Sequence, residues 1–247
     1  MNARPTWECH QIYYDALSKT RVLNSLFVPH ERNQTNLKYY ENDVILELYN
    51  SISTIKSDYI GTTSWRFAEK TRFSTIEFRK KIEKSLGKFD VIFFTPFNHI
   101  GENNVKRNKE AYPALYQLQV MFDKKFNFDV KFLTDKWTAS YCNYWIAKKT
   151  VFNEYVETVL IPFYEFFENN SDAIGLREIK HAGKQTPIAP FVMELLMGYF
   201  VNKSKIPHTT IWPDRCNDFV ESRKSRLHKA QSAMARLFKI CRAQTAK

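Results

Sequence analysis

Apolar residues recur three or four positions apart over several stretches of the chain, which is the spacing of one face of an α-helix. Between residues 41 and 55 this face includes Val44, Ile45 and Leu48. Ser74 is followed by Glu77 three positions later, a pattern typical of the residue that caps the start of a helix. The spacing predicts helices, each with one face on a core, over residues 41–55, 74–86, 112–122, 152–167 and 187–200.

Continuous apolar runs alternate with these helices. The clearest run lies between Gly87 and Pro96 and predicts a strand at 89–95 that is buried on both faces, as in a parallel sheet. Strands alternating with helices indicate a three-layer α/β domain, in which ligands bind beyond the carboxyl ends of the strands. Further strands are expected at 10–14, from 59 onward, and at 128–133, 141–147 and 208–212, with irregular or extended chain at 22–29 and polar loops at 30–36 and 98–108.

The composition fits one such domain. The chain has 247 residues, of which 44% are hydrophobic, enough for one large core. Its 6 glycines form neither G-x-G-x-x-G nor G-x-x-x-x-G-K-[ST], which argues against conventional dinucleotide and P-loop sites. No apolar run reaches the roughly 18 residues of a membrane span, and the N-terminus lacks a secretory signal. Because the four cysteines form no C-x-x-C pair, the sequence favours a reducing, cytoplasmic compartment and no zinc site.

Positive charge is concentrated at the end of the chain. The net charge is +11, and the 26 residues from 222 to 247 contain eight basic residues and no acidic one. Apolar residues share one helical face here, which predicts a basic amphipathic tail over 214–247. Such a tail is either simply solvated or binds a polyanion, nucleic acid or an anionic membrane surface. The polyanion-binding candidates are Arg223, Lys224, Arg226, Lys229, Arg236 and Lys239.

Residues 58–67 combine an aromatic, apolar segment with a polar end. Gly61 lets the backbone approach a ligand closely, Trp65 offers a stacking surface, and Arg66 and Lys70 supply positive charge. A nucleotide diphosphate needs these groups, so the segment is a candidate binding site. The alternative is that Trp65 belongs to the core and Arg66 to a surface ion pair.

Two acidic residues are candidates for catalysis. Asp90 opens the strand at 89–95, where its carboxylate could hold a metal or a sugar hydroxyl, or could instead cap a neighbouring helix or pair with Lys88. Glu194 lies within an apolar helix and is either a general base or half of an ion pair on the side of that helix. None of the six histidines falls in an H-x-x-x-H or H-E-x-x-H motif, so each is expected to be structural or exposed.

Four short motifs occur in a fixed order: DYIGTTSWRF at 58–67, FDVI at 89–92, NYWIAKKTVFNEY at 143–155 and ELL at 194–196. This order resembles that of small bacterial glycosyltransferases of the GT-A type associated with capsular and surface polysaccharide synthesis, and the resemblance covers about residues 41–212. Three positions depart from the family pattern. Ser64 replaces a histidine, Phe67 replaces a second arginine, and Leu195 replaces an arginine.

The resemblance implies a single GT-A-like, Rossmann-like domain over residues 1–213 that takes a sugar from a nucleotide-sugar donor. It implies Glu194 as the base of the transfer and Asp90 as a second catalytic residue, with or without a divalent metal (Mg²⁺ or Mn²⁺) at Asp90. The donor-binding residues that it implies, together with the neighbouring strand ends, are Tyr59, Gly61, Ser64, Trp65, Arg66, Lys70, Thr95 and Asn143.

The acceptor stays open between two kinds of hydroxyl. One is a surface glycan or lipid-linked saccharide, with the basic tail lying on the membrane. The other is a hydroxylated base in viral DNA, which the enzyme would reach by flipping it out of the duplex. A non-catalytic nucleic-acid-binding module on an enzyme-like fold is the alternative from another class, favoured by the absence of a D-x-D motif.

Overall fold

The computed structural model describes residues 4–23, 25–32, 41–95, 113–127, 142–170, 178–181 and 184–214. The chain divides into two compact units, Met1–Trp212 and Pro213–Lys247, and only Pro213 and Asp214 of the second unit are described. The expected loop at 98–108, the expected strand at 128–133 and the basic tail from 215 onward lie outside the described residues. The fold described is therefore that of the first unit.

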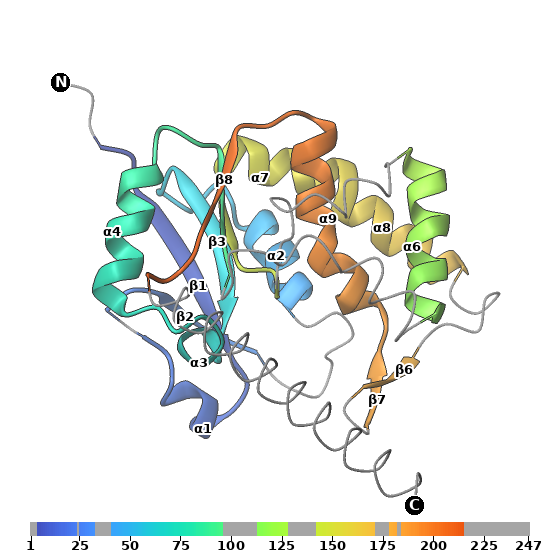
Figure 1. Cartoon of the computed structure of the whole chain (residues 1–247), viewed down its shortest axis with the longest axis horizontal. Helices are drawn as coiled ribbons and strands as arrows, with labels where there is room; N and C mark the ends of the chain where they lie inside the picture. Colours follow the sequence, from blue (N-terminus) through green and yellow to red (C-terminus); the bar gives the residue numbers. More distant parts are fainter. Residues whose placement is uncertain are drawn as a thin grey trace, which may run out of the picture. The chain divides into compact units, whose positions relative to one another are not determined.

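The centre of this unit is a six-stranded mixed sheet (Figure 1). Its strands are β1 (Trp7–Tyr13), β2 (Val28–Glu31), β3 (Tyr59–Ser64), β4 (Val91–Phe94), β5 (Trp145–Lys148) and β8 (His208–Ile211), in the order β2-β1-β3-β5-β4-β8. Within this sheet β5 alone runs against its neighbours, β3 and β4. The carboxyl ends of β1, β3 and β4 therefore lie at one end of the sheet, together with the amino end of β5. We call this end of the strands the carboxyl edge of the sheet.

The strands at the middle of the sheet are buried on both faces. All six residues of β3 and all four of β4 are buried. Successive side chains point to opposite faces, so Ile60 and Trp145 pack in one core while Tyr59 and Ile146 pack in the other. Two cores, one on each face of the sheet, confirm the expected α/β arrangement of three layers.

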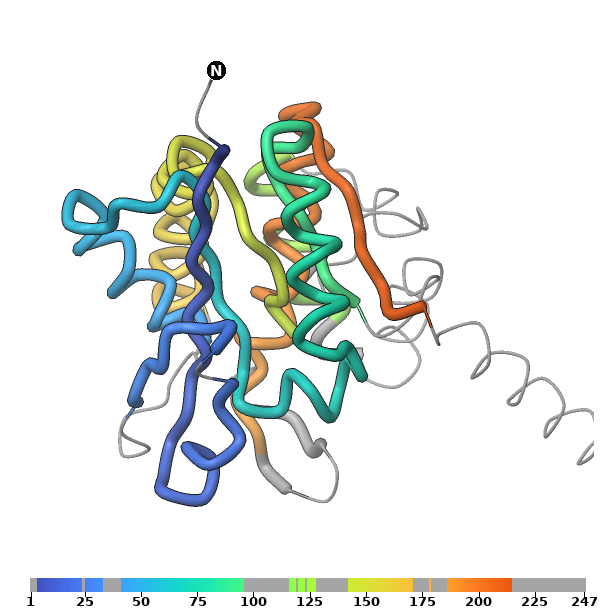
Figure 2. Tube along the Cα trace, turned by 90° about the vertical axis from the view of Figure 1, so that its left-hand side faces the viewer, coloured from blue at the N-terminus to red at the C-terminus, as the bar shows by residue number. Residues whose placement is uncertain are grey.

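Helices cover both faces (Figure 1). One face carries α3 (Phe67–Thr71) and α4 (Thr75–Ser85). The other carries α2 (Glu41–Asn50), α7 (Lys149–Tyr155), the π-helical turn η4 (Val156–Leu160), α8 (Ile161–Asn170) and α9 (Ala189–Lys203). Helix α6 (Pro113–Phe126) packs on α8 and α9, farther from the sheet (Figure 1). Helix α4 lies alongside β8 (Figure 2), where Lys81 Nζ donates to the carbonyl of Trp212 at 2.7 Å. A short helix, α1 (Ala16–Lys19), follows β1.

Several expectations are confirmed and others need correction. The Ser74 hydroxyl accepts from the N–H of Glu77 at 3.2 Å, so it caps α4 as predicted. The helix expected at 41–55 ends at Asn50, and His30 and Glu31, expected in a loop, belong to β2. The sheet is mixed rather than parallel, because β5 enters between β3 and β4. The hairpin of β6 (Glu178–His181) and β7 (Lys184–Pro187) was not anticipated.

Candidate functional site

Buried hydroxyl groups meet where β3 and β4 end. The Ser64 Oγ and the Tyr144 OH are 2.5 Å apart, and both side chains are buried. Tyr144 immediately precedes β5, and its carbonyl accepts from the N–H of Phe94 at 2.9 Å. Thr95, the next residue, is also buried, and its N–H donates to the carbonyl of Ile211 at 3.1 Å. The structure therefore brings the predicted residues Ser64 and Thr95 to the same edge, with Tyr144 between their strands.

A lysine lies beside these hydroxyls. Lys70 comes from α3, which begins soon after β3, and its Nζ is 3.1 Å from the Sγ of Cys142 and 5.8 Å from the centre of the Tyr144 ring. Cys142 and Asn143 form a tight turn in which both residues have positive φ, 56° and 53°. Left-handed backbone is unfavourable for cysteine and is found mostly where the surrounding structure imposes it. This turn sets the thiol against the ammonium group.

Two carboxylates complete the cluster, which we call the Lys70 cluster (Ser64, Lys70, Cys142, Tyr144, Glu41 and Glu194). Glu41 is the first residue of α2 and Glu194 lies in the first half of α9, and both are partly buried. Both interact electrostatically with Lys70 and with Cys142. Two residues that were predicted separately, Lys70 for the donor and Glu194 as a base, therefore influence each other's charge, and Glu41, which was not predicted, does so too.

The protonation states in the Lys70 cluster follow from burial and from these charges. Burial raises the pKa of the Cys142 thiol to about 12, and nearby Glu194 contributes to that rise. Burial alone would lower the pKa of Lys70, but Cys142, Glu194 and Glu41 raise it above its ordinary value. Since the thiol is neutral near pH 7, the two carboxylates are the charges that keep Lys70 protonated. A thiol with a raised pKa is a poor nucleophile, because the thiolate is the reactive form.

The pKa of Glu41 lies above its ordinary value. Burial raises its pKa, and the positive charge of Lys70 opposes that shift only in part. Asn143 helps to fix the position of Glu41, because its Nδ2 donates at 3.2 Å to the Oδ1 of Asn42, the following residue. Asn143, predicted to bind the donor, thus links the turn before β5 to the start of α2.

Trp65 and Arg66, predicted to bind the donor, directly follow Ser64 at the end of β3. The Arg66 guanidinium is 5.8 Å from the centre of the Trp65 ring, and it also pairs with Glu69. Arg21 lies on the same ring at 4.9 Å. The surface ion pair that was the alternative for Arg66 is therefore present, although Arg66 lies only four residues before Lys70 in the chain.

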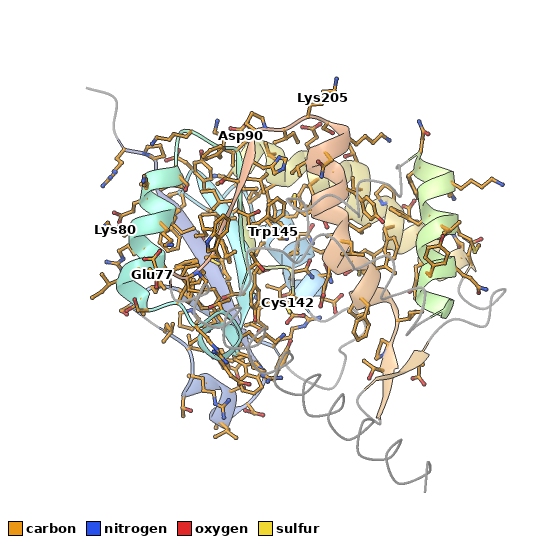
Figure 3. All side chains as sticks on the ribbon, viewed as in Figure 1. Glu77, Lys80, Asp90, Cys142, Trp145 and Lys205 are labelled. Atoms are coloured by element: carbon orange, nitrogen blue, oxygen red, sulfur yellow. The ribbon has the colours of Figure 1, made fainter. Side chains whose placement is uncertain are left out.

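Three predicted residues do not reach the Lys70 cluster. Tyr59 is at the amino end of β3, roughly 16 Å of strand away from Ser64, and its hydroxyl donates to the carbonyl of Phe89 at 2.8 Å. Asp90 precedes β4 and pairs with Lys148 Nζ at 2.5 Å. Figure 3 shows Asp90 and Cys142 towards opposite ends of the sheet, with Trp145 between them. Tyr59 and Asp90 therefore lie outside the site.

Gly61 is the third of these residues, and it lies inside the sheet. A Cβ at this position would be 2.8 Å from the Cα of Ile146 and closer still to the carbonyl oxygen of Trp145. The close approach that Gly61 permits is therefore that of strand β5, rather than that of a ligand.

The described residues give no support for a metal at Asp90. A single carboxylate with a lysine ammonium at 2.5 Å does not suit a divalent cation, which needs several oxygen ligands. Among residues with described positions, no group of three or more His, Cys, Asp and Glu side chains could hold a metal ion. The basic residues Arg223, Lys224, Arg226, Lys229, Arg236 and Lys239 lie outside the described ranges.

A shallow hollow of about 350 Å³ lies along α4, away from the Lys70 cluster. It is lined by Ser25, Thr75, Ile76, Arg79, Lys80 and Glu83, none of which the sequence had indicated. Arg79 is held there by a hydrogen bond to the carbonyl of Ser25. The hollow shares no residue with the Lys70 cluster and plays no part in its chemistry.

Reasoning from the sequence missed Glu41, Cys142, Tyr144 and Arg21. A signal existed for Glu41, since it begins a predicted helix, and for Tyr144, since it follows Asn143 in one of the motifs. Nothing in the sequence relates Arg21 to Trp65 or Cys142 to Lys70, because both contacts depend on which strands are neighbours.

Comparison with known proteins finds no relative: no protein-family model, no curated protein and no solved structure matches the chain. Within the described part of the chain, no helix has the length and apolar character needed to cross a lipid bilayer.

Proposed function

We propose that the protein is a glycosyltransferase that moves a sugar from a nucleotide-sugar donor to a hydroxyl acceptor, on a GT-A-like α/β fold. The observation that carries the proposal is the Lys70 cluster, in which the charge of Lys70, held against Cys142, interacts with two carboxylates, Glu41 and Glu194, at the carboxyl edge of the sheet. Ligands of α/β sheets bind at this edge. The motifs at 58–67 and 194–196, which carry the resemblance to GT-A enzymes, contribute residues to this edge.

Sugar transfer needs a cation for the leaving group. When the bond between the anomeric carbon and the diphosphate oxygen breaks, the diphosphate keeps the electron pair and gains negative charge. Lys70 and Arg66 supply positive charge to it, and Lys70 is already fixed by Cys142 and Tyr144. A preorganised cation stabilises developing charge without reorganisation at the moment of reaction.

The transfer also needs a base for the acceptor. The acceptor oxygen forms the new bond to the anomeric carbon and gives up its proton, which passes to a carboxylate. Glu194 is the predicted base, and Glu41 is a second carboxylate within reach of the same lysine charge. The buried hydroxyls of Ser64 and Tyr144, which are hydrogen-bonded to each other, lie beside this lysine.

The proposal is tested by screening the full-length protein against a panel of nucleotide sugars. Thermal unfolding should shift upward with the cognate donor, because a ligand that binds only the folded state stabilises it, and the nucleoside diphosphate should be released. Lys70→Met is expected to lower kcat/KM by about 100-fold or more, the loss typical of a removed electrostatic contact to the transition state.

Lys148→Met is the matched control. Lys148 is also a partly buried lysine in an ion pair, but it lies with Asp90 at the opposite end of the sheet. It should leave kcat/KM unchanged. A panel without any turnover, or a Lys70→Met variant as active as wild type, rejects the proposal.

A further inference from the structure

Two guanidinium groups lie against one tryptophan at the carboxyl edge of the sheet. The Cζ of Arg21 is 4.9 Å and that of Arg66 is 5.8 Å from the centre of the Trp65 ring. Glu69 joins the two cations: its Oε2 accepts from Nη1 of Arg21 at 3.4 Å and from Nε of Arg66 at 3.2 Å, while its Oε1 accepts from Nη2 of Arg66. A single carboxylate thus occupies the space that two guanidinium groups share.

A buried side chain holds the two segments that carry these arginines. Gln11 in β1 is fully buried. Its Oε1 accepts from the N–H of Leu23 at 2.7 Å, and its Nε2 donates to the carbonyl of Ser64 at 3.1 Å. Leu23 lies two residues after Arg21, and Ser64 directly precedes Trp65. The backbone geometry of the arginine pair is therefore set by β1 and β3, independently of Glu69.

The chemistry of the pair suits an anion richer in oxygen than a carboxylate. Guanidinium groups bind carboxylate and phosphate with the same paired N–H geometry. Glu69 offers two oxygens and one negative charge to two cations. A diphosphate offers more oxygens and more charge, and it could also reach the ammonium of Lys70, which follows Glu69 in α3.

We propose that Arg21, Trp65 and Arg66 form a binding site for a diphosphate anion, in which Glu69 is the resident counter-ion that the ligand displaces. The choice of a diphosphate rests on the proposed function, whereas the anion site itself rests on the geometry of the two guanidinium groups. Glu69 holds both arginines in place while the ligand is absent, and it competes with the ligand for them. Its carboxylate therefore weakens binding, although it lies inside the site.

Titration calorimetry of the full-length chain with inorganic pyrophosphate tests this inference. Glu69→Gln removes the competing charge and keeps the side-chain shape, and it is expected to tighten pyrophosphate binding by about tenfold. Arg21→Gln removes a charge-assisted hydrogen-bond donor and is expected to weaken binding by about tenfold. Thermal unfolding of each variant checks that it is folded.

A second surface ion pair provides the matched controls. Arg4 Nη1 is 3.6 Å from Glu83 Oε2, and both side chains are exposed, as are those of Arg21 and Glu69. Arg4→Gln and Glu83→Gln change the net charge by the same amounts at a different place. They should leave the affinity for pyrophosphate unchanged, so a response to either shows a general charge effect and overturns the inference.

The affinities of these variants for pyrophosphate decide whether the anion site exists. The inference is overturned if Glu69→Gln fails to tighten pyrophosphate binding, or if Arg21→Gln binds as well as wild type. UDP and GDP should likewise bind more tightly to Glu69→Gln than to wild type. A nucleotide that binds both proteins with the same affinity binds at a different place. Pyrophosphate binding that follows the expected pattern without any sugar transfer supports this site and rejects the transferase. If sugar transfer occurs and neither Glu69→Gln nor Arg21→Gln changes the KM for the donor, the transferase is supported and this anion site is rejected.

Discussion

Replacing Gly61 by alanine tests whether this glycine serves the sheet or a ligand. The residue lies at the middle of β3, paired with Ile146 of β5 in the antiparallel register. The added Cβ would be 2.8 Å from the Cα of Ile146 and 2.9 Å from its Cγ2, and closer still to the carbonyl oxygen of Trp145. Two of these three atoms are backbone, so no side-chain rotation relieves the contact.

The cost follows from the ladder that must open. An ordinary contact to Cβ begins at 3.4 Å, so β3 and β5 have to part at the point where their hydrogen bonds hold them together. Losing two buried backbone hydrogen bonds, each leaving groups unsatisfied, costs about 3–5 kcal/mol of unfolding free energy. Native domains have only about 5–15 kcal/mol in total, so Gly61→Ala is expected to remove a large part of the stability.

Urea unfolding followed by tryptophan fluorescence and circular dichroism measures this loss. Gly87→Ala is the control, because Gly87 has a φ of 75° but its added Cβ meets only Pro5 Cγ, at 3.6 Å. It should cost no more than the roughly 1–2 kcal/mol of a left-handed residue. If Gly61→Ala unfolds within about 1 kcal/mol of wild type and nevertheless loses nucleotide binding, the steric argument is wrong and the glycine faces a ligand.

Three further substitutions test other parts of the molecule. Burial raises the pKa of Glu41 in the folded protein above that in the unfolded chain, so the stability linked to this group is full at low pH and is lost as pH rises through the folded pKa. Glu41→Gln should therefore raise the unfolding temperature at pH 7 more than at pH 4 in thermal scans, and an equal shift at both would contradict the assignment. Asp90→Asn breaks a partly exposed pair with Lys148 and should cost at most about 1 kcal/mol in urea unfolding. The Asp90→Asn variant should also keep a rate of sugar transfer within about twofold of wild type, a change of less than about 1.4 kcal/mol. A variant that is folded but inactive would show that Asp90 belongs to the site after all. Ser74→Ala removes the cap of α4 and should cost about 1 kcal/mol by the same method, whereas unchanged stability would mean that the Ser74 hydroxyl contributes nothing.

Local elements of this fold were predictable because their causes are local. The cap at Ser74 depends on a residue three positions away, and the apolar run before Pro96 marks β4 as buried whatever surrounds it. The aromatic segment at 152–167 was predicted as one helix, and its π-helical turn at Val156–Leu160 was not predicted. Helical spacing identifies the buried face of a helix. It does not reveal where the helix takes up one extra residue in a turn, which is what makes the turn π-helical.

The position of the site was predictable only in part. The expected edge does contain Ser64, Lys70 and Thr95, because each of them ends or follows a strand whose carboxyl end lies there. Tyr59 begins the strand that Ser64 ends, and Asp90 precedes the strand that Thr95 follows, so both lie at the other end of the sheet. Proximity in sequence thus grouped residues that the extended backbone separates.

The sequence by itself determined most of the helices and the central strands, which of their faces are apolar and which chemical groups are present. Only the tertiary structure decided which of these groups meet. The insertion of β5 between β3 and β4 places Cys142 and Tyr144 beside Lys70, and it also explains why residue 61 is glycine. The pairing of Arg21 with Trp65 likewise depends on β1 and β3 being parallel neighbours joined through Gln11. The physical reason is the same in each case: local patterns report short-range forces, whereas a site depends on strand order, which the packing of the whole chain selects.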